Sequence, residues 1–118
     1  MKTVVIGASN NPERYAYKAI KMLQDHGHEV VAVSNKKEEV LGLTIQNTDK
    51  LEEAVDTITL YVGPQNQSHY QEYILNTNPR RVIFNPGTEH PEFEQILENR
   101  GIIAEEACTL VLLSTGQY

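Results

Sequence analysis

The chain has 118 residues, of which 40% are hydrophobic and 22% charged, with a formal net charge of −6. This length predicts one domain, residues 1–118, in which any catalysis would need a partner protein. The negative charge argues against binding of duplex nucleic acid. The apolar stretch at residues 3–8 is too short for a signal peptide or a membrane span, so we expect a cytoplasmic protein without membrane contact.

Few side chains offer disulfide or metal chemistry. Cys108 is the single cysteine, so no internal disulfide can form. The histidines at positions 26, 28, 69 and 90 do not follow the spacing of a metal site. We therefore expect no metal, and we expect these histidines to be structural or solvated.

Short apolar runs alternate with segments of helical periodicity along the chain. The runs predict strands over residues 3–6, 29–33, 57–62, 81–85 and 102–104, and the periodic segments predict helices over 12–26, 66–75 and 91–100. A shorter helix is expected over 50–55, and a short helix or turn over 110–114. This order predicts an α/β fold with a single Rossmann-like, doubly wound and mainly parallel five-stranded sheet and flanking helices.

Each of the three longer predicted helices has one apolar face. Pro12 suits the first turn of the first helix, and Gly27 and Gly101 suit the ends of the first and third. The residues expected to face the core are Ala16, Ala19, Ile20 and Leu23 in the first helix, Tyr70, Tyr73 and Ile74 in the second, and Phe93, Ile96 and Leu97 in the third.

The turn after the first strand has the composition of a phosphate site. Gly7, Ala8 and Ser9 connect the strand to the first helix, whose unpaired N–H groups and positive dipole end favour anions. The three-glycine dinucleotide fingerprint is absent, because Ser9 and Pro12 stand where its later glycines belong, and the P-loop motif is also missing. The turn therefore predicts a nucleotide-like anion without identifying it.

Small and turn-forming residues follow the other predicted strands as well. In a doubly wound sheet, ligands bind outside the carboxyl ends of the strands, near the switch in strand order. The residues at those ends are Ser34 to Lys37 after the second strand, Gly63 and Pro64 after the third, Asn85, Pro86 and Gly87 after the fourth, and Glu105 to Cys108 after the fifth.

The end of the second strand discriminates between nucleotides. Enzymes that use the non-phosphorylated nicotinamide dinucleotide place an acidic residue there, whereas this chain has Ser34, Asn35, Lys36 and Lys37. A lysine ammonium binds phosphate, so a nucleotide with an extra ribose phosphate is favoured. Coenzyme A and the phosphorylated nicotinamide dinucleotide both fit this description.

Several motifs match one family in combination. They are Gly7, Ala8 and Ser9, the run from Asn11 to Arg14, Tyr17, the run from His26 to Val30, Asn35 with Lys36, and Leu41 with Gly42. From Val4 to about Cys108 the sequence resembles the small coenzyme A-binding domain proteins, whose fold also forms the N-terminal domain of succinyl-CoA synthetase α subunits. The resemblance implies that the diphosphate lies over residues 7–9 and the adenosine near Asn35 and Lys36.

The resemblance also implies a path for the pantetheine arm, past Tyr61, Val62 and Pro64 toward the later strand ends. The second half departs from the family pattern there. Residues 84–88 keep only the glycine turn of the family's Trp-x-Gln-x-Gly-like stretch, and Cys108 keeps only the cysteine of its Arg-Cys-Pro element. If the arm runs to the fifth strand end, its thiol would approach Cys108.

The prediction is a coenzyme A or acyl-CoA binding protein without established catalysis. The alternatives are an NADP-dependent or other nucleotide-binding enzyme, and a subunit that presents coenzyme A to a separate protein partner. The expected binding residues are Gly7, Ala8, Ser9, Asn11, Pro12, Tyr17, Ser34, Asn35, Lys36, Tyr61, Val62, Pro64, Asn85, Pro86, Gly87, Glu106 and Cys108.

Overall fold

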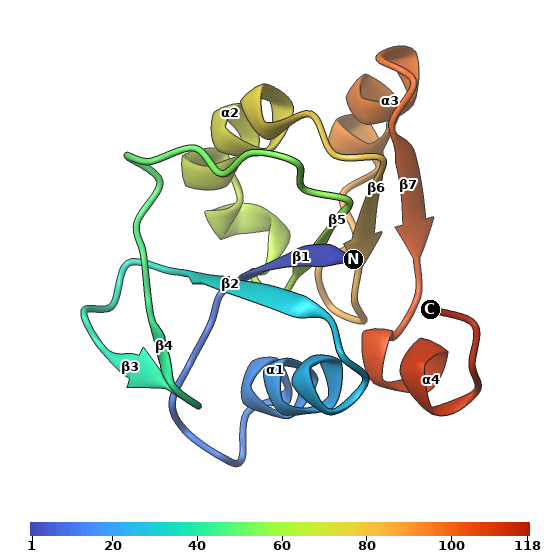
Figure 1. The fold of residues 1–118 in the computed structure, drawn as a ribbon. Coiled ribbons are helices and arrows are strands. Elements are labelled where there is room, and N and C mark those ends of the chain that lie inside the picture. Colours follow the sequence, from blue (N-terminus) through green and yellow to red (C-terminus); the bar gives the residue numbers. More distant parts are fainter.

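A five-stranded parallel sheet forms the centre of the molecule (Figure 1). The computed structural model describes all 118 residues, and the strand order is β2-β1-β5-β6-β7. The strands are β1 (Lys2–Ile6), β2 (Glu29–Val33), β5 (Thr57–Leu60), β6 (Arg81–Phe84) and β7 (Ile103–Glu106). Every neighbouring pair is parallel, which confirms the predicted doubly wound α/β fold.

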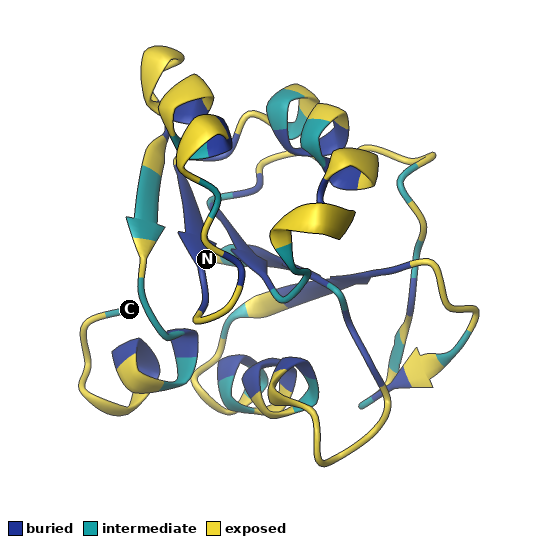
Figure 2. Cartoon of the chain, turned by 180° about the vertical axis from the view of Figure 1, so that it is seen from behind, coloured by how far each residue is buried: buried dark blue, intermediate teal, exposed yellow.

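Helices cover both faces of this sheet. In Figure 1, α1 (Tyr15–Asp25) and α4 (Thr109–Ser114) lie below the sheet, and α2 (Ser68–Thr77) and α3 (Pro91–Asn99) lie above it. Side chains alternate between the faces, so Val4 and Ile6 join the core under α2 and α3, whereas Val5 joins the core over α1. Figure 2 shows the result, a sheet whose inner strands are buried between helices with exposed outer surfaces, while the edge strand β7 is intermediate or exposed.

The predicted helix faces are confirmed except at one position. Ile96 is 45% exposed, whereas Phe93 and Leu97 on the same helix are buried. The helix α3 packs against β7 at the edge of the sheet, where Ile96 stays exposed to solvent. The other expected core residues are buried as predicted, namely Ala16, Ala19, Ile20, Leu23, Tyr70, Tyr73 and Ile74.

The first helix begins three residues later than predicted. Asn11 directs a turn before it, in which its carbonyl oxygen accepts a hydrogen bond from the Arg14 N–H at 3.0 Å and its side-chain oxygen accepts one from the Glu13 N–H at 3.0 Å. Pro12 therefore lies in this turn, and its predicted place in the first turn of the helix is wrong. The predicted helix ends hold, since Gly27 and Gly101 adopt positive φ just after α1 and α3.

The helix predicted over residues 50–55 is wrong, because this segment is irregular. Leu51 is 46% exposed and Ala54 has φ of +59°, so only Val55 of its apolar residues is buried and the backbone is not helical. A short hairpin before it was not predicted, and it consists of β3 (Glu39–Val40) and β4 (Leu43–Thr44). Leu41 and Gly42 both have positive φ, as a two-residue hairpin turn requires.

Three predicted strand ends move by one or two residues. The strand predicted over 57–62 ends at Leu60, and the one predicted over 81–85 ends at Phe84. The last strand was predicted over 102–104 but extends to Glu106, so Glu105 and Glu106 lie within β7 instead of after it. The predicted helix over 66–75 is divided into the short 3-10 helix η1 (Pro64–Asn66) and α2, and the short helix near 110–114 is confirmed as α4. Every helix falls short of the length and hydrophobicity needed to cross a membrane.

Candidate functional site

A cavity of about 650 Å³ lies at the carboxyl ends of β1, β2, β5 and β6. It spans the switch in strand order between β1 and β5, where the chain goes to opposite faces of the sheet. The predicted residues that line it are Gly7, Ala8, Ser9, Ser34, Asn35, Lys36, Tyr61, Val62, Pro86 and Gly87. The structure therefore brings together the loops that follow four of the five strands.

Seven predicted residues do not line this cavity. They are Asn11, Pro12, Tyr17, Pro64, Asn85, Glu106 and Cys108. The expected binding set in turn left out eight lining residues, although Gly63 is expected at the end of the third predicted strand; they are Arg14, Tyr15, Ala16, Gly63, Asn66, His69, Tyr70 and Thr88. Most of these belong to the starts of α1 and α2, so a more accurate helix start would have found them.

The glycine turn after β1 is held mainly by protein contacts. Gly7 has φ of +92°, and a Cβ atom built on it would lie 2.9 Å from the carbonyl oxygen of Tyr61. The N–H groups of Gly7 and Ala8 both donate to the carbonyl oxygen of Val33, at 2.8 and 3.2 Å. These two N–H groups are engaged within the sheet, so any free donors for an anion lie further along the chain.

Free donors are found at the start of α1. The N–H groups of Tyr15, Ala16 and Tyr17 form no hydrogen bond within the protein, and the N-cap residue Arg14 provides no side-chain cap. No acidic residue occurs in this first turn. Because Arg14, Tyr15 and Ala16 line the cavity, the positive end of the helix dipole faces it.

The start of α2 lies on another wall of the cavity. Its N-cap residue, Gln67, makes no capping hydrogen bond, and its first turn has no acidic residue. The contrast is α3, which does not reach the cavity. There His90 Nδ1 accepts a hydrogen bond from the Phe93 N–H at 3.1 Å, and Glu92 and Glu94 occupy the first turn. The two helices that face the cavity therefore keep uncompensated positive ends.

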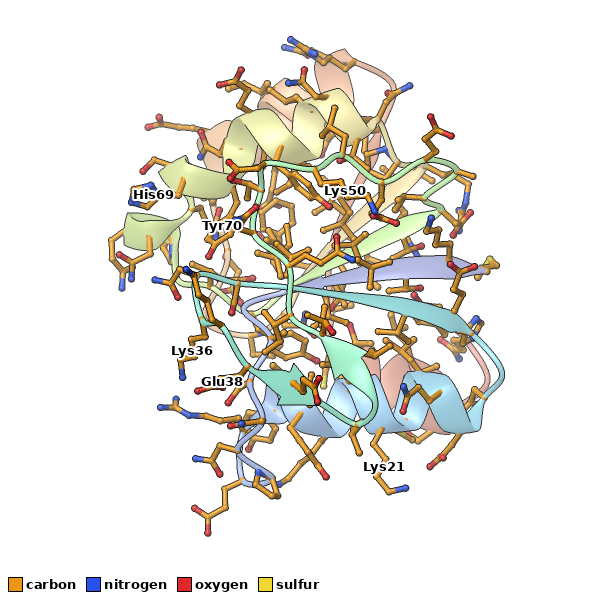
Figure 3. The ribbon with its side chains drawn as sticks, turned by 60° about the vertical axis from the view of Figure 1, so that its left-hand side comes forward. Lys21, Lys36, Glu38, Lys50, His69 and Tyr70 are labelled. Atoms are coloured by element: carbon orange, nitrogen blue, oxygen red, sulfur yellow. The ribbon has the colours of Figure 1, made fainter.

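The charged side chains that line the cavity are both cationic. The chain has 16 acidic residues, yet neither Asp nor Glu is among the lining residues, which include Arg14 and Lys36. Lys36 lies on the loop after β2, where its N–H donates to Ser34 Oγ at 3.1 Å. Figure 3 shows Lys36 on this loop and His69 and Tyr70 on α2, all toward one side of the molecule. The cavity is therefore suited to an anion.

Gln67 connects two loops of the cavity from beneath. Its side chain is completely buried, and Nε2 donates to the carbonyl oxygens of Val62 at 2.9 Å and Thr88 at 2.6 Å. Val62 follows β5 and Thr88 follows β6, and both line the cavity. One amide group thus fixes the distance between these loops, while its Oε1 atom remains without a partner.

Asn85, predicted to bind the ligand, has a structural role in the structure. Its Nδ2 group donates to Thr59 Oγ1 at 2.7 Å and to the Leu60 carbonyl oxygen at 2.8 Å. Its Oδ1 atom accepts a hydrogen bond from the Thr109 N–H at 2.9 Å. The amide joins β5, β6 and α4 and has both N–H groups engaged, which explains why Asn85 lies behind the cavity wall.

Glu94, Glu106 and Cys108, three titratable groups around β7, lie outside the cavity. Burial, with a smaller effect of the Glu106 carboxylate, raises the pKa of Glu94, and this pair lies where α3 meets β7. Cys108 is a half-buried free thiol just before α4.

Tyr61, which follows β5, does line the cavity. Burial raises the pKa of Tyr61, and its hydroxyl group is buried without a hydrogen-bond partner. Its phenol therefore remains protonated near neutral pH.

The parallel sheet, the cavity at the strand switch and the two helix starts that face it define a Rossmann-like α/β domain. The comparison with known families makes this specific. The chain belongs to the family of CoA binding domains, whose model matches residues 1–114.

Solved structures support the same fold. One crystal structure, described only as that of an uncharacterized protein, has a TM-score of 0.97 and 52% sequence identity, with 99% of this chain and 97% of that chain covered. A protein from Thermus thermophilus has a TM-score of 0.86 and 26% identity, with 99% and 90% covered. Among curated proteins, the uncharacterized protein YneT of Bacillus subtilis is 23% identical over 101 residues, which cover 85% of this chain and 75% of YneT.

Proposed function

We propose that the chain binds coenzyme A in the cavity at the strand switch, as a binding module. One observation carries this proposal: in an acidic protein, the cavity is lined by Arg14 and Lys36 and by no carboxylate. A ligand with several phosphate groups gains from both cations and from the uncapped start of α1. Membership in the family of CoA binding domains identifies which phosphorylated nucleotide to test first.

The two parts of the cavity suit the two parts of this ligand. Lys36 on the loop after β2 is placed for the ribose phosphate, and the free N–H groups at the start of α1 are placed for the diphosphate. The remaining wall, with Tyr61, Val62 and Pro86, has no charged side chain and suits the pantetheine arm. Neither a carboxylate nor a thiol lines the cavity, so we assign binding and no reaction to it.

A ligand series tests the proposal. We expect coenzyme A to raise the melting temperature more than NADP or NAD does, because a ligand that binds only the folded state stabilises it. Removal of the ribose phosphate from coenzyme A should reduce the shift. Equal shifts for all ligands, or none for coenzyme A, would contradict the proposal, and a larger shift with NADP would favour the dinucleotide instead.

A pair of lysine variants locates the site. Lys36→Ala should weaken coenzyme A binding about fivefold, since an exposed lysine–phosphate contact contributes about 1 kcal/mol, and the difference should shrink in high salt. The control is Lys21→Ala, which removes the same charge from an exposed position on α1 outside the cavity (Figure 3). Calorimetric affinities that fall equally in the two variants would place the ligand elsewhere.

A further inference from the structure

We propose that the cavity takes free coenzyme A or a thioester with a short, polar acyl group, and that it leaves a long hydrocarbon chain in water. This inference rests on the proposed function and specifies its ligand class. The alternative, a carrier of fatty acyl groups, requires an apolar slot beside the thiol end of the ligand.

The cavity contains no such slot. Its lining has no Leu, Ile, Met or Phe. Its apolar side chains are the small Ala8, Ala16, Val62 and Pro86, together with the rings of Tyr15, Tyr61 and Tyr70. The large apolar side chains are enclosed within the two cores on either face of the sheet, where side chains such as Phe84 and Ile20 are fully buried. An acyl chain in this cavity would therefore meet a mixed, mainly polar surface without a continuous aliphatic slot.

The wall at the start of α2 is also polar. It is formed by the start of α2, which contributes Asn66 and His69, and by Thr88 on the loop after β6. Tyr70 lies behind them, 9% exposed, with most of its ring in the core under α2. This wall offers hydrogen-bonding groups to a short polar acyl group and little apolar surface to a hydrocarbon chain.

The next cavity does not supply the missing apolar surface. It has a volume of about 370 Å³ beside the β3–β4 hairpin, and Ile45 is its one apolar lining residue, among Lys37, Glu38, Glu39 and Thr44. The exposed aliphatic side chains Leu51, Ile96, Ile103 and Val111 line neither cavity, and Tyr15 is the one large exposed apolar residue that lines the main cavity. Neither this second cavity nor these exposed side chains therefore give an apolar site to a long chain that leaves the main cavity.

Chain length provides a quantitative test. Each methylene group transferred from water into an apolar slot would tighten binding about fourfold. We expect calorimetric affinities for acetyl-, butyryl-, hexanoyl- and octanoyl-CoA to change less than about twofold per added pair of methylene groups. A gain of about fifteenfold per pair would overturn the inference. If free coenzyme A itself does not bind, the proposed function falls and this inference falls with it, whereas strong binding of coenzyme A with a steep length dependence overturns the inference alone.

A matched pair of variants tests the assignment of the α2 wall. His69→Leu places an aliphatic side chain on this wall, so the ratio of octanoyl-CoA affinity to coenzyme A affinity should rise severalfold. His26→Leu makes the same change at an exposed position after α1, outside the cavity, and should leave this ratio unchanged. An unchanged ratio in His69→Leu, or an equal rise in both variants, would overturn the placement of the acyl end at α2.

Discussion

Gly7 shows how one residue can serve both the fold and a ligand site. The sequence assigns Gly7 to a phosphate turn, but the fold itself also requires glycine at this position. Its φ is +92°, and a Cβ atom built on it would lie only 2.9 Å from the Tyr61 carbonyl oxygen. A Gly7 variant that loses ligand binding could therefore do so because the loops after β1 and β5 have moved apart, and not because a contact with the ligand is lost. Stability must be measured before affinity is interpreted.

A pair of glycine variants separates backbone strain from steric contact. Gly87 has the same φ of +92°, but no atom lies within 4 Å of its built Cβ atom. We expect Gly87→Ala to cost about 1–2 kcal/mol of unfolding free energy from the positive φ alone. Gly7→Ala should cost about 1–3 kcal/mol more, because the Tyr61 backbone must move. Urea unfolding without ligand measures both, and equal losses would show that the contact with Tyr61 relaxes without cost.

At the scale of elements, two buried amide side chains hold the loops of the cavity in register. Gln67 joins the loops after β5 and β6, and Asn85 joins β5 and β6 to the start of α4. The hydrogen bonds between parallel strands hold the strands together but not the loops that follow them. The hydrogen bonds of Gln67 and Asn85 therefore fix the positions of these loops.

Asn85→Ala should destabilise the protein by about 3 kcal/mol, since it leaves the Leu60 carbonyl oxygen and the Thr109 N–H buried without their partner. Asn99→Ala is the control, because Asn99 is exposed at the end of α3 and accepts one hydrogen bond, from Gln95. Its cost should stay below about 0.5 kcal/mol. Similar losses in the two variants, measured by urea unfolding, would contradict the structural role assigned to Asn85.

The sequence predicts elements well where burial alone defines them. Runs of β-branched residues are enough to predict the strands β1, β2, β5 and β6, and one apolar face is enough to predict α1. The segment 50–55 has an apolar period as well, but no neighbour covers Leu51, so tertiary context decides against a helix. The β3–β4 hairpin depends on positive φ at Leu41, a residue type that gives no turn signal.

At the scale of the molecule, topology explains which site residues were predictable. The strand switch places the loops after β1, β2, β5 and β6 around one cavity, and simple alternation of strands and helices is enough to predict that. Glu106 was expected after the fifth strand, but β7 extends through it, and neither Glu106 nor Cys108 lines the cavity. The contributions of Arg14 and His69 depend on where α1 and α2 begin, which periodicity does not resolve.

The opposite end of the sheet joins the first and last segments of the chain. The ring of Tyr118 lies 4.9 Å from the ring of His28 and 4.6 Å from the Arg81 guanidinium carbon, and its hydroxyl group is hydrogen-bonded to Thr3. The amino group of Met1 lies 3.3 Å from His28 Nδ1. Burial, followed by the positive charges of this amino group, His26 and Arg81, lowers the pKa of His28 below its usual value of 6.5.

This shift predicts a pH dependence of stability. The unfolded chain binds a proton at His28 more readily than the folded protein does. Above pH 6.5 His28 is neutral in both states and costs no stability. As the pH falls below 6.5 toward the lowered pKa of the folded state, protonation favours the unfolded chain and the free energy of unfolding decreases. Between about pH 7.5 and pH 5.5, the unfolding free energy of the wild type should therefore fall more steeply than that of His28→Gln. His69→Gln, at an exposed position on α2, should retain the wild-type slope. If His28→Gln and the wild type lose stability in parallel over this range, the protonation of His28 is not coupled to folding.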